Sequence, residues 1–286
     1  MTIFQLVVLM GQVLAQPGAA APDASAQKDS FKRWVEYYSE QAVKYEFSLG
    51  KEQRRLELQA KPVLQYSNPV RPTDQHGAVY VWTLDGRPEV IGSIWSNEDP
   101  KDTSVRVVMN EFQSLSLDSI VSRHPQRRGS KGQIPDWNSS APGIKLQILP
   151  DAAAAEKSAP ARLSQMRRLA AEFSAQITSS EIESESKLRL LTSPLMRYAS
   201  KSAKVSDGGL FAFVQATDPE LLLLLELRET TDGPRWHYAA ARFTNRPLLL
   251  TRGERKLWEC ERGEDYVAHN PYFLYLGVAR RSSTFE

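Results

Sequence analysis

Hydrophobic residues recur at helical spacing in two segments of this chain, one in each half of the sequence. In both segments the steps are mostly three, four or seven residues, which places the hydrophobic side chains on one face of an α-helix. The first set is Phe31, Trp34, Tyr38, Ala42 and Tyr45, and the second set is Leu163, Met166, Ala170, Phe173 and Ile177. The pattern therefore predicts one amphipathic helix near the start of each half.

After each of these segments the hydrophobic pattern is that of β-strands. Residues 80–84 and 89–95 flank Asp85-Gly86, a pair that is typical of tight turns, so they predict a β-hairpin. The apolar run Leu221–Leu225 predicts a strand that is covered on both faces. A last apolar segment ends each half, at residues 144–149 and 272–276.

The order of these signals repeats when 132 is added to the residue number, and the offset becomes 131 after one residue is lost. The matched pairs include Pro62 and Pro194, Tyr66 and Tyr198, Gly77 and Gly209, Pro88 and Pro219, and Phe112 and Phe243. We therefore expect an α+β fold of two tandem-duplicated units, each an N-terminal helix packed on a mostly antiparallel β-sheet. The alternative is two β-rich halves that share a rhythm of strands and turns without common ancestry.

The N-terminal residues have a different pattern. Residues 3–14 are apolar apart from three positions, and Val13-Leu14-Ala15 supplies the small residues of a signal-peptidase site. This run is too short to span a bilayer and predicts a signal peptide, although no Lys or Arg precedes it. A buried N-terminal strand or helix is the alternative. We expect an exported protein, periplasmic or extracellular, with no integral membrane segment after cleavage.

Composition divides the chain further, because an Ala/Pro-rich stretch follows the apolar run and an Ala-rich stretch between two prolines separates the halves. The expected division is a signal peptide at 1–15, a disordered linker at 16–27, a first unit at 28–150, a connector at 151–160 and a second unit at 161–286.

Charge and composition argue against several functional classes. The 286 residues include 36 basic and 34 acidic ones, and the net charge of +2 gives no field that would attract nucleic acid. No two of the four histidines lie three or four residues apart, and Cys260 is the only cysteine. We therefore expect no metal, no cofactor and no intramolecular disulfide, and Cys260 is expected to be a small buried or half-buried strand residue.

A few residues remain as candidates for a site. Glu89 and Glu220 occupy matched positions and could approach each other as a carboxylate pair, although a polar strand start is the simpler interpretation. Trp82 and Trp95 could form an aromatic platform for a glycan or peptide, although core packing also explains them. The third candidate is a basic loop that could hold an anion or simply be solvated, with Arg127, Arg128 and Lys131.

Segments of both halves resemble a family of uncharacterised exported bacterial proteins of planctomycete type. The segments that carry the resemblance are residues 77–95, 111–116, 209–215 and 218–220. The resemblance implies export but no known activity, and it assigns no functional residue.

Three functional hypotheses follow from these patterns. The first is an exported binding or structural protein without catalytic activity, because no reactive constellation is present. The second is a hydrolase with an acidic site between the two units, with Glu89 or Glu220 as the acidic residue. The third is a subunit of a cell-envelope assembly, which would dock through a sheet edge. The partner stays unknown among glycan, peptide and envelope protein.

Overall fold

The fold is mostly β, as shown by a computed structural model that describes residues 24–68, 74–99, 101–123, 136–179, 184–263 and 269–281. Strands make up 54% and helices 13% of this structure, and two helices occur in the described residues. The predicted α+β fold of two helix-on-sheet units is therefore wrong. One reason is that the second helical pattern continues beyond its helix, since Phe173 and Ile177 belong to a strand.

One large sheet, which we call the first sheet, is built from six antiparallel strands. These are β3 (Glu57–Leu58), β4 (Leu64–Ser67), β5 (Gln75–Leu84), β6 (Arg87–Asp99), β7 (Asp102–Ser114) and β19 (Tyr272–Arg281). Their order is β19-β7-β6-β5-β3, and β4 also pairs with β5. The predicted hairpin around Asp85-Gly86 is confirmed, because β5 and β6 pair across this turn and both turn residues have positive φ angles.

The second sheet has nine strands. These are β10 (Gln147–Ile148), β11 (Phe173–Ile177), β12 (Ser186–Leu190), β13 (Met196–Ser200), β14 (Val205–Gln215), β15 (Asp218–Thr230), β16 (Gly233–Arg242), β17 (Leu248–Arg252) and β18 (Arg255–Cys260). Their order is β10-β16-β15-β14-β12-β11-β17-β18, and β13 also pairs with β14. The sheet is curled, and β12 connects its two parts by pairing with β11 through residues 186–188 and with β14 through residues 189–190.

A third, smaller sheet lies beside the first sheet. Its strands are β1 (Glu46–Leu49), β2 (Arg54–Arg55), β8 (Ile120–Arg123) and β9 (Asn138–Ser139), in the order β2-β1-β8-β9. The backbone turns from β2 into β3 of the first sheet at Leu56, whose N–H donates to the carbonyl oxygen of Phe47 in β1. The two sheets therefore continue into each other.

Each half contains one helix, α1 (Ala24–Val43) in the first half and α2 (Ala159–Ala171) in the second. Ser158 caps α2 by accepting a hydrogen bond from the N–H of Ala161, and Pro160 lies in the first turn, where its missing N–H costs little. Helix α1 begins inside the segment 16–27 that was predicted to be a linker. Neither helix has the length and hydrophobicity needed to cross a membrane, a finding limited to the described part of the chain.

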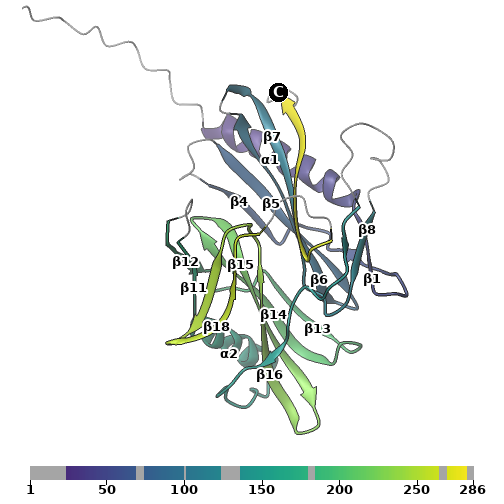
Figure 1. Cartoon of the computed structure of the whole chain (residues 1–286), viewed down its shortest axis with the longest axis vertical. Coiled ribbons are helices and arrows are strands. Elements are labelled where there is room, and N and C mark those ends of the chain that lie inside the picture. Colours follow the sequence, from purple (N-terminus) through teal and green to yellow (C-terminus); the bar gives the residue numbers. More distant parts are fainter. Residues whose placement is uncertain are drawn as a thin grey trace, which may run out of the picture.

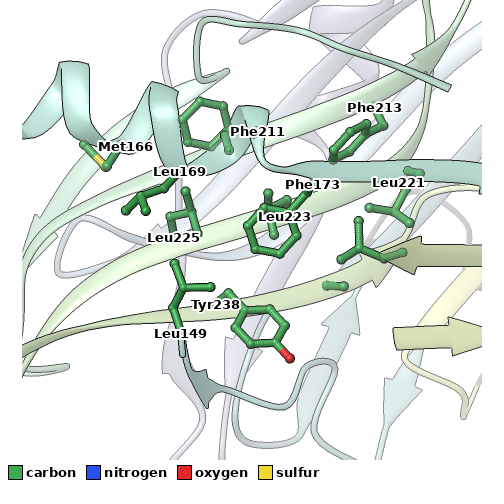
Figure 2. Packing of buried hydrophobic residues seen from close by; sticks show 14 of the residues in the cluster. Leu149, Met166, Leu169, Phe173, Phe211, Phe213, Leu221, Leu223, Leu225 and Tyr238 are labelled. Atoms are coloured by element: carbon green, nitrogen blue, oxygen red, sulfur yellow. The ribbon is translucent and has the colours of Figure 1, made fainter. Parts of the chain in front are cut away.

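The two large sheets pack face to face, and each carries its helix on the outer face. Alternate residues of one strand therefore enter different cores: Val79 and Val81 of β5 point between the sheets, whereas Trp82 points toward α1. The run Leu221–Leu225 is fully buried, which confirms the prediction of a strand covered on both faces. Figure 2 shows the outer core of the second half, where Met166 and Leu169 of α2 pack over the strands.

The last strand of each half pairs with the sheet of the other half. Strand β10 ends the first half but pairs with β16, and its neighbour Leu149 packs into the core of the second half (Figure 2). Strand β19 ends the second half but pairs with β7, so the yellow C-terminal strand in Figure 1 lies among elements of the first half. The exchange ties the two halves to each other by backbone hydrogen bonds.

The central hairpins of the two halves have the same pairing. Tyr66 of β4 lies opposite Gly77 and Trp95 lies on the other side of Gly77, while Tyr198 and Glu226 flank Gly208 in the same way. A bulge interrupts the pairing at Glu89, just after Pro88, in one hairpin and at Glu220, just after Pro219, in the other. By this pairing the partner of Gly77 is Gly208 rather than the predicted Gly209.

Candidate functional site

Trp82 lies in the core and not on a binding platform. Its side chain is 1% exposed and packs edge-on against Phe47, with ring centroids 4.7 Å apart. The pairing places Phe213 at the corresponding position of the second half, so an aromatic ring belongs there in both halves. The indole of Trp82 also borders a cavity of about 360 Å³ beside the end of α1.

Glu89 belongs to a buried ion-pair network between the sheets, which we call the closed cluster: Arg87, Glu89, Tyr198 and Glu226. The Arg87 guanidinium contacts Glu226 at 2.9 Å and Glu89 at 3.0 Å. Glu226 is fully buried, accepts a hydrogen bond from the hydroxyl of Tyr198 at 2.9 Å and also pairs with Arg228 of its own strand at 2.5 Å. Arg87 comes from the first half and Glu226 from the second, so the network joins the two large sheets.

The charges of the closed cluster depend on each other. Burial disfavours the charge of Arg87, but the carboxylates of Glu226 and Glu89 outweigh burial and raise its pKa. Burial raises the pKa of the Glu89 carboxyl, and Arg87 opposes that effect. Glu89 is 6% exposed and none of the cavities described here includes it, so its position does not suit a group that must reach a substrate.

Glu220 and Trp95, two of the predicted site residues, do line a common cavity between the two sheets. This acidic cavity has a volume of about 200 Å³ and is also lined by Glu111, Asp218 and Tyr272. Strand β15 supplies Asp218 and Glu220, β6 supplies Trp95, β7 supplies Glu111 and the exchanged strand β19 supplies Tyr272. The strand exchange therefore completes the cavity.

Glu111 is a buried acid of the acidic cavity, 7% exposed. The hydroxyl of Tyr272 donates to its Oε1 at 2.6 Å. Burial raises the pKa of the Glu111 carboxyl well above its ordinary value, and the charges of Asp218 and Glu220 raise it further, against hydrogen bonds from Tyr272 and Trp95. Burial and like charge thus favour the protonated form of Glu111.

One basic residue also lines the acidic cavity. Arg246 lies 3.5 Å from Glu220 Oε1 and donates a hydrogen bond of 2.6 Å to Gln215 Oε1. The lining therefore holds three acids, Glu111, Asp218 and Glu220, against one arginine. Among the described residues, no group of three or more His, Cys, Asp or Glu side chains could hold a metal ion.

A second cavity lies where the exchanged strands enter, and we call it the junction cavity. Its volume is about 570 Å³, and Tyr272 separates it from the acidic cavity by lining both. Its apolar lining includes Ile144, Ala240 and Trp258. Lys145 and Arg242 supply positive charge, and no acid occurs among its described lining residues.

Arg242 is held firmly at the wall of the junction cavity. Its guanidinium lies over the ring of Tyr272, 5.6 Å from the centroid, and donates to the sulfur of Cys260 at 2.8 Å and to the carbonyl oxygen of Glu261. Cys260 is half-buried in β18, in agreement with its predicted place in a strand. Burial raises the pKa of the Cys260 thiol although Arg242 opposes this, so the thiol stays a neutral partner.

Several residues of these cavities were not found from the sequence. Glu111 and Tyr272 come together from different halves of the chain, and Arg242 ends a strand after three alanines. No sequence signal set Glu111 apart, because its strand also carries Asp102, Arg106 and Asn110. The predicted basic loop with Arg127, Arg128 and Lys131, like the signal peptide, lies outside the described residues.

Comparison with protein-family models, with curated proteins and with solved structures gave no match for this chain.

Proposed function

We propose that this protein is an exported, non-catalytic binding protein that holds a small amphipathic anion in the junction cavity. The observation that carries the proposal is the lining, which combines apolar residues with Arg242 and Lys145 and contains no acid among its described residues. Ligand sites typically have volumes of about 300–1000 Å³ and few polar groups, and the junction cavity fits this description at about 570 Å³.

The arrangement suits binding better than catalysis. None of the described lining residues of the junction cavity is Ser, Cys, His, Asp or Glu, so no nucleophile with an adjacent base is present there. Trp258 offers an apolar surface, while Gln113 and Asn270 could fix the orientation of a polar group. Export remains a proposal that rests on the apolar N-terminal run.

One observation favours the hydrolase as a second candidate. The acidic cavity brings the carboxyl of Glu111, whose pKa is raised by burial and by neighbouring charge, close to Glu220. An acid and a carboxylate in unlike environments are what glycoside hydrolysis requires. However, Glu89 is absent from this cavity, and about 200 Å³ is less than a typical ligand site.

A pair of fluorescent probes tests the binding proposal on the full chain. The anionic probe is 1-anilinonaphthalene-8-sulfonate, and N-phenyl-1-naphthylamine has the same rings without the sulfonate. We expect saturable one-to-one binding of both probes. Arg242→Met should weaken the anionic probe about tenfold, equivalent to about 1.4 kcal/mol, and leave the neutral probe unchanged. Trp258→Ala should weaken both probes.

Arg235→Met is the matched control, because it removes the same charge from the exposed end of the same strand. Lys145→Met removes the second positive charge of the cavity from an exposed position, so it can be used if the Arg242 variant folds poorly. Equal weakening of both probes by Arg242→Met, or binding that Trp258→Ala leaves intact, would contradict the proposal. Turnover of a panel of nitrophenyl glycosides or esters that Glu220→Gln abolishes would favour the hydrolase.

A further inference from the structure

The acidic cavity has an excess of acceptors. Besides its three acids, it is lined by Gln75, which is 5% exposed. The amide nitrogen of Gln75 donates to Asp218 Oδ2 at 3.2 Å, whereas its buried carbonyl oxygen has no hydrogen-bond partner among the described residues. A buried acceptor without a donor is costly, so the group missing from this place is a hydrogen-bond donor.

The closed cluster shows which donor the same framework accommodates. By strand pairing, Asp218 stands at the position of Arg87, Glu220 at that of Glu89, and Trp95 at that of Glu226. In the closed cluster a guanidinium lies between carboxylates at 2.9 and 3.0 Å. In the acidic cavity the carboxylate at the Glu89 position is kept and lies 3.5 Å from Arg246, but the position of Arg87 itself holds another acid, so the lining has three acids against one arginine.

The rest of the lining suits a planar organic cation. Trp95 and Tyr272 bring aromatic rings to the cavity, and aromatic faces attract guanidinium and ammonium groups. A guanidinium has five N–H donors in one plane, which matches several carboxylate and amide oxygens at once. The three acids do not form a group that could hold a metal ion in the described part of the chain, which favours an organic cation.

We propose that the acidic cavity binds the guanidinium group of a small organic cation, which there takes the place that Arg87 fills in the closed cluster. The volume of about 200 Å³ limits the ligand to a guanidinium with a short aliphatic tail, or to the tip of a longer one. Glu220 and Asp218 would accept its N–H groups, with the carbonyl oxygen of Gln75 as a third acceptor. This inference does not rest on anion binding in the junction cavity.

Calorimetric titration of the full chain with ethylguanidinium tests this inference. We expect saturable binding, with an affinity that Glu220→Gln lowers at least about tenfold. Asp232→Asn, which removes an acid from an exposed turn of the same sheet, should leave the affinity unchanged. Butylammonium should bind more weakly than ethylguanidinium, and neutral butanol should not bind.

Proton release on binding is a second measurement, and a purely structural role of Glu220 would not produce it. The charged and titratable groups around Glu111 are Asp218 and Glu220 of β15, Arg246, Tyr272 of β19 and Tyr66 of β4. A bound cation favours the ionised form of Glu111, so binding should release a proton and strengthen as the pH rises toward the raised pKa of Glu111. Glu111→Gln should bind without proton release.

Three outcomes would overturn the inference: no saturable binding of ethylguanidinium at 10 mM, equal binding by the Glu220→Gln variant, or displacement of ethylguanidinium by Mg²⁺ or Ca²⁺. The result is separable from the proposed function, because Glu220→Gln should still bind 1-anilinonaphthalene-8-sulfonate in the junction cavity.

Discussion

The closed cluster and the acidic cavity occupy corresponding places in the two halves, yet one is filled and the other is open. In the closed cluster Arg87 and Arg228 neutralise Glu89 and Glu226 without any ligand. In the acidic cavity Asp218 stands at the position of Arg87, and Glu111 stands at the position of the fully buried Ala239. The same framework therefore supports a structural ion-pair network on one side and, on the other, a cavity with three acids, one arginine and a Gln75 carbonyl oxygen that has no donor among the described residues.

The difference between the two sites indicates which of them stabilises the fold and which is suited to binding a ligand. A buried ion pair is strongly destabilising to break, because removal of one partner leaves the other charge without compensation. Acids that repel one another contribute no such stability, and burial of an unpaired acceptor weakens the fold. We infer that the closed cluster holds the sheets together. The acidic cavity instead lowers the stability of the free protein, and a bound ligand would restore that stability.

The largest expected effect comes from breaking the closed cluster. Arg87→Met should lower the free energy of unfolding by about 3–5 kcal/mol, because Glu89 stays buried without a cation and Glu226 keeps only Arg228. Asp218→Asn is the matched change in the other half and should cost less than about 1 kcal/mol, since it relieves repulsion and can keep the hydrogen bond from Gln75. Urea unfolding measures both, and losses of similar size would contradict the comparison.

An intermediate effect is expected from the two matched tyrosines. Tyr198→Phe removes a hydroxyl that donates to the charged Glu226 at 2.9 Å and should cost about 1.5–3 kcal/mol. Tyr66→Phe removes a hydroxyl bonded to the neutral Ser93 at 3.0 Å and should cost about 0.5–1.5 kcal/mol. Thermal and urea unfolding of the two variants should give this order, and the reverse order would show that the two halves do not differ as inferred.

The smallest effect is a change in pH dependence. Because the pKa of Glu111 is higher in the folded protein than its ordinary value of 4.5, the folded state binds the extra proton, and stability falls as the pH rises from 4.5 toward the raised pKa. Glu111→Gln lacks this proton, so its stability relative to the natural protein should rise over the same range. Urea midpoints at several pH values between 5 and 8 measure the difference.

Glu89→Gln is the control for this change. Burial raises the pKa of Glu89 as well, but here the variant removes a partner of Arg87 and should be destabilising over that whole range. A constant difference between Glu111→Gln and the natural protein from pH 5 to pH 8 would count against the inferred protonation of Glu111.

Local elements of this fold were predictable because their signals are local. The β5–β6 hairpin follows from Asp85-Gly86, whose positive φ angles the turn requires, and helix α1 follows from the spacing of Trp34, Tyr38 and Ala42, which are all buried. The fully buried part of β15 follows from its run of leucines. Each signal lies within a few consecutive residues.

The fold class was wrong because hydrophobic periodicity does not state which strands pair. Residues 144–149 and 272–276 were predicted to close their own halves, but β10 and β19 pair with the opposite sheets. For the same reason the predicted carboxylate pair of Glu89 and Glu220 does not exist. Glu220 instead shares a cavity with Glu111, which reaches it through pairings that a sequence pattern does not encode.

The exchanged C-terminal strand also constrains the order in which the chain can fold. Tyr272 and Glu111 are bonded across 161 residues of sequence, so β7 lacks its outer neighbour until β19 has been synthesised. Contacts over such distances form slowly, because a long loop must close before they become favourable. The first sheet can therefore be completed only after the whole second sheet has left the ribosome.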